Sequence, residues 1–131
     1  MAGIIDISKL NTPPEKHEFE TAKYFAEQGK DIVFIRPSGM PDVHTPDIMM
    51  DGVEWEIKCP EGKSKRTIEE NFRKAVKQSR YIIFDLRWIK VDENLCLSQL
   101  QKEFDFRHYL KRLLVIRKNS ELTEIYFSDN S

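Results

Sequence analysis

Apolar residues recur at helical spacing in three parts of the chain, with short apolar runs between them. Helical spacing gathers the apolar side chains on one face, which can pack against a core. Gly29 follows the first segment at the position where helices commonly end, and Ser98 opens the third as a candidate N-cap. The pattern therefore predicts helices over residues 15–28, 67–79 and 98–112.

The short apolar runs have the length and composition of β-strands. In one place two such runs flank Asp51-Gly52, the dipeptide preferred in a two-residue type I′ hairpin turn. Residues 31–36 and 81–86 are predicted to form further strands, and the last segment, 113–127, is predicted to form a second hairpin. Strands that alternate with helices indicate a mixed α/β fold, a central mixed sheet flanked by helices.

Composition fits one globular domain. The chain has 131 residues, of which 40% are hydrophobic, enough to build a core. We expect residues 1–13 to be an irregular lead-in and residues 14–131 to form a single domain. No apolar run is long enough to span a bilayer, so we expect no membrane anchor. The two cysteines, Cys59 and Cys96, are expected to be reduced and do not make a metal-binding cluster.

The stretch TPDIMMDGVEWEIKCP holds the candidate chemistry. A turn at Asp51-Gly52 places Asp47 directly across from Glu56, and opposed residues of a hairpin share one face, with Cβ atoms about 5 Å apart. Because strand side chains alternate between faces, Lys58 lies on the same face as Glu56. The hairpin thus predicts two carboxylates and an amine in one cluster.

Two carboxylates about 5 Å apart repel each other by roughly 3 kcal/mol at an effective dielectric constant of 20. A divalent cation relieves this repulsion, and Mg²⁺ prefers carboxylate oxygens and retained waters. Asp47 and Glu56 are therefore candidate ligands of one or two Mg²⁺ or Mn²⁺ ions, and Lys58 could orient a nucleophile or stabilise charge on a phosphate. From geometry alone, a solvated surface group is the plain alternative.

The motif adds to this interpretation. The letters PD at 46–47, followed after eight residues by EIK at 56–58, resemble the PD-(D/E)xK pattern of restriction-endonuclease-like nucleases. That resemblance implies a restriction-endonuclease-like fold in which the helix before the hairpin carries a further acidic residue. Glu18 fits because helical spacing places it on the inward face of the first helix. The predicted catalytic residues are Glu18, Asp47, Glu56 and Lys58.

Residues 16–88 as a whole resemble the C-terminal toxin nucleases of contact-dependent growth-inhibition systems. The resemblance implies a phosphodiester hydrolase that cleaves RNA, tRNA in particular, in preference to DNA, and acts in a bacterial cytoplasm. It also implies delivery from another cell as part of a larger toxin, and a cognate immunity protein as partner. Whether the chain is an excised domain or a whole gene product stays open.

Three alternatives remain at this point. One is a DNA endonuclease, and another is a non-catalytic nucleic-acid-binding module. The third is a metal-independent tRNase toxin with a barnase-, EndoU- or colicin-like fold, in which the carboxylate pair is structural. Acid–base and phosphate chemistry would then come from His17, Lys58, Arg66 and Thr67.

A basic segment follows the hairpin. The net charge is only −1, yet residues 59–80 carry seven basic and three acidic side chains. Such a segment can contact nucleic-acid phosphates even in a nearly neutral protein. Some of these charges instead have the i,i+4 spacing of pairs that stabilise a solvated helix. The predicted substrate-binding residues are Lys63, Lys65, Arg66, Thr67, Arg73 and Gln78.

Overall fold

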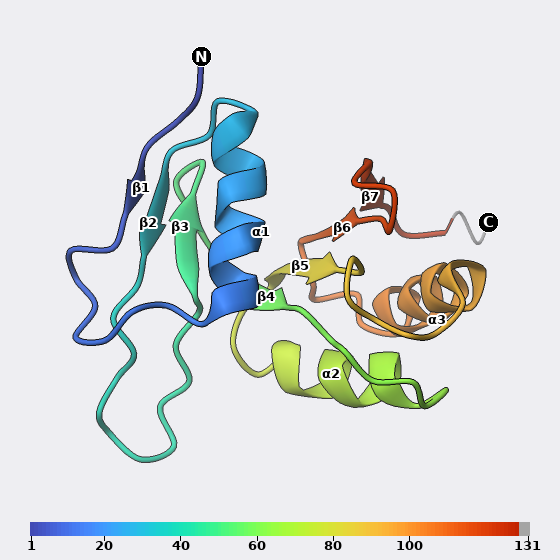
Figure 1. The fold of residues 1–131 in the computed structure, drawn as a ribbon. Helices are drawn as coiled ribbons and strands as arrows, with labels where there is room; N and C mark the ends of the chain where they lie inside the picture. Colours follow the sequence, from blue (N-terminus) through green and yellow to red (C-terminus); the bar gives the residue numbers. More distant parts are fainter. Residues whose placement is uncertain (129–131) are drawn as a thin grey trace.

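The computed structural model describes residues 1–128, and its strands form one mixed sheet in the order in which they occur along the chain (Figure 1). The strands are β1 (Ile5–Asp6), β2 (Ile32–Phe34), β3 (Ile48–Met50), β4 (Val53–Lys58), β5 (Tyr81–Asp85), β6 (Arg112–Ile116) and β7 (Leu122–Ile125). The helices are α1 (Lys16–Glu27), α2 (Thr67–Ala75) and α3 (Glu93–Asp105). The predicted mixed α/β fold with helices flanking a central sheet is confirmed.

This sheet contains three parallel and three antiparallel strand pairs. The β3–β4 and β6–β7 pairs are the two antiparallel hairpins, and β2 also pairs antiparallel with β3. The β1–β2, β4–β5 and β5–β6 pairs are parallel. Parallel neighbours need a crossover segment, and here α1, α2 and α3 each lie in one of these crossovers.

The first helix has the ends that its sequence predicts. The carboxylate of Glu15 accepts hydrogen bonds from the backbone N–H groups of His17 and Glu18, which caps the first turn. At the other end Gly29 adopts a φ of 92°, a left-handed conformation that favours glycine. The predicted helix over 15–28 is therefore confirmed with its boundaries one residue shorter at each end.

The β3–β4 hairpin has the predicted turn and register. Asp51 and Gly52 both have positive φ, 54° and 77°, as a type I′ turn requires. Met50 pairs with Val53, and the ladder continues to the pair of Ile48 with Trp55. The turn therefore fixes which side chains of the two strands meet.

Two hydrophobic cores lie on opposite faces of the sheet. One is built around α1 and includes Phe25, Trp55 and Ile57; the other is built around α2 and α3 and includes Phe72 and Phe84. Figure 1 shows α1 beside the first strands, with α2 and α3 together below the later ones. Strand β5 contributes Ile82 and Phe84 to one core and Ile83 to the other, which explains its nearly continuous apolar sequence.

Several predicted boundaries are wrong. The third helix spans 93–105 and not 98–112, because the carboxylate of Asp92, not Ser98, caps it by accepting a hydrogen bond from Leu95 N–H at 3.2 Å. The second helix ends at Ala75 and not at 79, because Ser79 Oγ donates to the Glu54 carbonyl and ties the chain to β4.

The lead-in and the C-terminal part differ in how far they match the predictions. Residues 1–13 contain the short strand β1, which pairs with β2 and was not predicted. The predicted final hairpin is confirmed as β6 and β7. The division into a lead-in and one domain over 14–131 stays a prediction. Within residues 1–128, none of the helices combines the length and the hydrophobicity that crossing a bilayer would need.

Candidate active site

Asp47, Glu56 and Lys58 meet at the open end of the hairpin. The Nζ atom of Lys58 lies 3.2 Å from Oε2 of Glu56. The carboxyl groups of Asp47 and Glu56 are close enough to interact directly. The cluster that the sequence predicts on one face of the hairpin is thus present in the structure.

Backbone pairing at Asp47 departs from the predicted ladder. Its N–H donates to the Trp55 carbonyl at 2.9 Å, so Asp47 and Glu56 are not a regular cross-strand pair. Oδ2 of Asp47 accepts the Ile57 N–H at 2.7 Å and takes the place of a backbone acceptor. The Asp47 carbonyl meanwhile accepts from Ile35 N–H at 2.9 Å. Asp47 therefore bridges the strands on both sides, which fixes its carboxylate beside Glu56.

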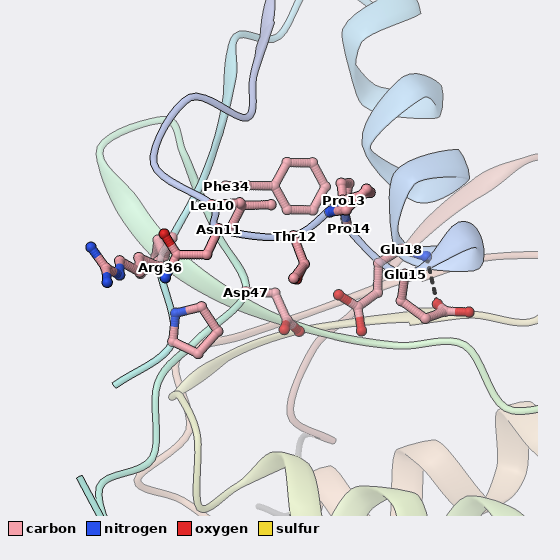
Figure 2. A pocket seen from close by; sticks show the side chains of 12 residues that line it. Leu10, Asn11, Thr12, Pro13, Pro14, Glu15, Glu18, Phe34, Arg36 and Asp47 are labelled. Atoms are coloured by element: carbon pink, nitrogen blue, oxygen red, sulfur yellow. Dashed lines mark hydrogen bonds between the residues drawn. The ribbon is translucent and has the colours of Figure 1, made fainter. Parts of the chain in front are cut away.

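Glu18 reaches the same place from α1. It is half-buried, and it lines one cavity together with Asp47 (Figure 2). Burial raises the pKa of Glu18 to about 7, the Asp47 carboxylate adds to the increase, and Lys58 opposes it. The inward orientation predicted for Glu18 from helical spacing is confirmed. We call Glu18, Asp47, Glu56 and Lys58 the carboxylate cluster.

Charge in the carboxylate cluster is poorly matched. Glu56 is only 3% exposed, and no donor reaches its Oε1 atom. Burial, followed by the Asp47 charge, raises the pKa of Glu56 to about 8, although Lys58 lowers it. Burial likewise raises the pKa of Asp47, against the Ile57 N–H that lowers it. One lysine thus faces three carboxyl groups that pay a desolvation cost when ionised.

A divalent cation suits these groups. Buried carboxylates with too few donors are stabilised by a positive ion, and Mg²⁺ binds through one or two carboxylates while keeping several waters. Asp47 and Glu56 are the residues that could hold it, and the unpartnered Oε1 of Glu56 is an available ligand atom. In the part of the chain that the structure describes, no group of three or more His, Cys, Asp or Glu side chains is arranged around one metal position. Water or substrate oxygens would complete the shell.

Comparison with known proteins places this site in a family. A sequence model described as "Contact-dependent growth inhibition CdiA C-terminal domain" matches residues 44–122, more than half of the chain. The chain belongs to this family. The matched region begins just before Asp47 and contains Glu56 and Lys58, whereas Glu18 lies outside it. No curated protein sequence matches the chain.

The fold of this CdiA C-terminal domain is also found in a solved structure. The match is the CdiA-CT/CdiI toxin and immunity complex from Burkholderia pseudomallei, with a TM-score of 0.64 and 19% sequence identity. It covers 94% of this chain and 98% of the other. At this identity the likeness shows a shared fold.

The four basic residues among the predicted substrate-binding residues are all exposed, and the two arginines share Glu69 as a partner. Lys63, Lys65 and Arg66 are exposed in the loop between β4 and α2. Arg73 is exposed and pairs with Glu69 at 2.6 Å, which reduces the charge it offers to a ligand. None of these contacts tests a role in binding, so the roles stay predictions.

Thr67 and Gln78 occupy the two ends of α2. Thr67 is buried at the first residue, and its hydroxyl lies close to Gly62. Gln78 follows the helix and keeps a buried Oε1 atom without a hydrogen-bond partner. Its neighbours include His44 and Pro46, directly before Asp47 in the chain. Gln78 is therefore closer to the hairpin than its position at the end of a helix suggested.

His17, the candidate for metal-independent chemistry, is engaged with other residues. Its Nε2 atom lies 3.1 Å from the Glu61 carboxylate, and its ring stacks on Trp88 with the centroids 4.0 Å apart. These contacts hold the start of α1 against the loops after β4 and β5. They do not test the acid–base role that a metal-independent tRNase would assign to His17, whose buried Nδ1 atom has no hydrogen-bond partner among the described residues.

The sequence did not reveal a second polar cluster, in which Asp85 contacts Thr21 and Arg87. We call these three residues the Asp85 cluster. Asp85 is fully buried at the end of β5 and forms an ion pair with Arg87, with Nη2 2.8 Å from Oδ2. Thr21 donates to the same carboxylate at 2.6 Å. The available signal was a single acid in the apolar run YIIFDL, where a buried charge requires a partner.

The sequence also did not predict that the lead-in contributes to the cavity beside the carboxylate cluster. Residues 10–14 run past the start of α1 and form one wall of the cavity that contains Glu18 and Asp47 (Figure 2). Further lining of the cavity comes from the end of β2 and the residues after it, 34–37. A segment with two prolines and no helical or strand pattern gave no sign of this position in the sequence.

Proposed function

We propose that this CdiA C-terminal domain is a metal-dependent nuclease of the PD-(D/E)xK type. The observation that supports this best is the convergence of Glu18, Asp47, Glu56 and Lys58 from α1 and the β3–β4 hairpin. Three half-buried or buried carboxyl groups with one lysine are costly for stability alone. Such a cluster suits a site whose charge is completed by a cation and a phosphate.

The roles follow from position. Asp47 and Glu56 would hold one or two Mg²⁺ or Mn²⁺ ions, which supply a more acidic bound water and charge stabilisation at the phosphate. Lys58, held 3.2 Å from Glu56, would place its positive charge beside the phosphate as negative charge develops. Glu18, with its pKa raised to about 7, can accept or release a proton near neutral pH and would position the attacking water.

The proposed substrate is RNA, with tRNA preferred over DNA. The resemblance of residues 16–88 to tRNA-cleaving toxin domains implies this substrate class. The exposed cations Lys63, Lys65 and Arg66 follow Lys58 within a few residues, which suits contact with a nucleic-acid backbone beside the scissile bond. Thr67, Arg73 and Gln78 would extend this contact along α2.

The biological setting follows from the family. We propose a toxin delivered from another cell as part of a larger protein, acting in the cytoplasm of the recipient bacterium. The solved relative is a complex of a toxin with its immunity protein. A cognate immunity protein is therefore the expected partner of this chain, since an unopposed nuclease would harm the cell that makes it.

Cleavage assays test the proposal. Purified protein is incubated with total tRNA and with plasmid DNA, each with Mg²⁺, with Mn²⁺ or with EDTA, alongside Asp47→Ala and Lys58→Ala. We expect metal-dependent cleavage of tRNA, and a loss of at least about 100-fold in each variant, the size typical of removing one charge-stabilising group. Circular dichroism checks that the variants fold, and Glu54→Ala, on an exposed position of the same strand, serves as the control.

Each contrary result has a definite meaning. Cleavage that survives EDTA would refute the metal requirement and favour the metal-independent tRNase. Preferred cleavage of plasmid DNA would refute the substrate class. Binding without cleavage under every condition would identify a non-catalytic module, and unchanged cleavage in both variants would remove Asp47 and Lys58 from the mechanism.

A further inference from the structure

The cavity beside Asp47 and Glu18 has the size of a binding site. Its volume is about 320 Å³, within the range of pockets that take small organic ligands. Figure 2 shows the carboxylates of Asp47 and Glu18 at one end of the cavity, with Thr12 pointing towards them. The cavity therefore opens directly onto the carboxylate cluster.

The lining of the cavity is apolar along one side and polar at its outer end. Apolar surface comes from Leu10, Pro13, Pro14 and Phe34, which lie together along one side. Hydrogen-bonding groups come from Asn11 and Arg36, both exposed, and Figure 2 shows Arg36 at the end farthest from Glu18. An apolar wall with a few polar groups at one end suits a flat, mostly apolar ring system that has a polar edge.

The charges exclude an anion as occupant. Glu15, Glu18 and Asp47 all line the cavity, and Arg36 at its outer end is the one basic residue among the lining groups. Apart from the scissile phosphate, whose charge the proposed metal ion would balance, a phosphate inside the cavity would be repelled by these carboxylates. A neutral base and its sugar would not be repelled.

We propose that this cavity binds the nucleoside next to the scissile phosphate, and that Asn11 and Arg36 contact the edge of its base. The inference rests on the proposed nuclease function. A phosphodiester at the carboxylate cluster carries a nucleoside on either side. The cavity is next to that position, because Asp47 itself lines it. Single-stranded RNA can present an unstacked base to such a pocket, where hydrogen bonds to the base edge select the nucleotide. The cavity thus determines which nucleotide stands beside the cut.

The test compares cleavage beside each of the four nucleotides. Wild-type protein, Asn11→Ala and Arg36→Gln are incubated with Mg²⁺ and a library of single-stranded RNA, and the ends of the products are sequenced. We expect the wild type to prefer one nucleotide, and each variant to lose about tenfold in kcat/KM at that nucleotide, the effect of one lost hydrogen bond. Rates at the disfavoured nucleotides stay unchanged.

Matched controls are Asn94→Ala and Lys111→Gln, which remove an amide and a positive charge at exposed positions that do not line the cavity. Cleavage without nucleotide preference by the wild type, a preference that survives in both variants, or an equal loss at all four nucleotides would each overturn the inference. These results differ from failure of the proposed function, in which the wild type cleaves no RNA at all.

Discussion

The carboxylate cluster and the Asp85 cluster are close in the fold and opposite in their electrostatics. Both take one residue from α1, where Glu18 and Thr21 are about one turn apart. The carboxylate cluster adds Glu56 and Lys58 from β4, and the Asp85 cluster adds Asp85 from the neighbouring strand β5. In the Asp85 cluster both carboxylate oxygens are used: Arg87 donates to each of them, and Thr21 donates to Oδ2. In the carboxylate cluster Oε1 of Glu56 has no donor.

This difference distinguishes a structural acid, Asp85, from Glu56, the acid for which we propose a metal ligand role. Asp85 is buried at low cost because donors satisfy its charge, and Arg87 also donates to the Glu20 carbonyl, which ties α1 to the end of β5. Glu56 is buried without such compensation, and its pKa rises to about 8. In the Asp85 cluster, protein donors satisfy the carboxylate, whereas the carboxylate cluster lacks positive charge. The Asp85 cluster therefore holds α1 so that Glu18 faces Asp47.

The largest expected effect is the loss of stability that follows from breaking the Asp85 cluster. Asp85→Ala leaves the Arg87 guanidinium without its partner and Thr21 without its acceptor. We expect the free energy of unfolding to fall by about 3 kcal/mol, as for other buried pairs that lose one member. Asp47→Asn keeps an oxygen that can accept the Ile57 N–H and removes a repulsive charge, so its stability should stay within about 1 kcal/mol of the wild type.

Urea unfolding followed by circular dichroism measures both values in EDTA. Asp42→Asn, at an exposed loop position whose φ of 63° asparagine also tolerates, controls for the loss of an aspartate charge. If Asp47→Asn destabilises the chain as much as Asp85→Ala does, the two clusters do not differ in the way described, and the carboxylate cluster is structural.

The sequence predicts one of these clusters better than the other for a physical reason. The two-residue turn and the period of a strand bring Glu56 and Lys58 to one face and Asp47 close to them, although the backbone pairing of Asp47 itself departs from the regular ladder. The carboxylate of Asp85 is satisfied by Thr21, 64 positions away, and no local rule brings these two residues together. Helical spacing predicted that Glu18 faces inward.

The same limit applies to the boundaries and to the cavity. Ser98 and Asp92 are both acceptable N-caps, and the choice between them depends on how α3 packs against α2. The lead-in wall depends on β1 pairing with β2, which positions residues 10–14 beside the hairpin. Only the assembled sheet determines these features.

The next largest effect is a dependence of stability on pH. An acid whose pKa is higher in the folded than in the unfolded chain binds more protons when folded, so stability falls as pH rises between the two values. For Glu56 this interval runs from 4.5 to about 8. Without metal, we expect the free energy of unfolding to fall by on the order of 2 kcal/mol between pH 5 and pH 8.

Glu56→Gln should reduce this fall and leave a smaller one from Glu18, whose pKa is raised to about 7, whereas Glu54→Gln, at an exposed position of the same strand, should leave it unchanged. The measurement is urea unfolding at both pH values in EDTA. Saturating Mg²⁺ should raise the stability of the wild type at pH 8 by about 1–3 kcal/mol and have little effect on Glu56→Gln. A wild-type stability that rises from pH 5 to pH 8 would contradict the charge deficit assigned to Glu56.

The contrast between matched and unmatched charge is repeated on the surface of α2. Arg66 and Arg73 both approach the carboxylate of Glu69, at 3.8 and 2.6 Å. Lys74 and Lys77 make no ion pair within residues 1–128, and they line a concave surface that begins at Cys59, next to Lys58. These two lysines are therefore expected to contact RNA phosphates more strongly than Arg66 and Arg73, whose charges are partly matched by Glu69.

The smallest expected effect is on the salt dependence of RNA binding. Each phosphate contact with single-stranded nucleic acid contributes about 0.7 to the slope of log K against log salt concentration. Replacing Lys74 and Lys77 by Gln should therefore reduce the slope by about 1.4. Replacing Arg66 and Arg73 by Gln removes the same amount of positive charge from the same basic segment. It should nevertheless change the slope less, because these arginines already have Glu69 as a partner. Fluorescence anisotropy of a labelled RNA in EDTA measures binding without cleavage. Equal changes in the two double variants would show that net charge alone matters, and that matching by Glu69 has no effect on substrate contact.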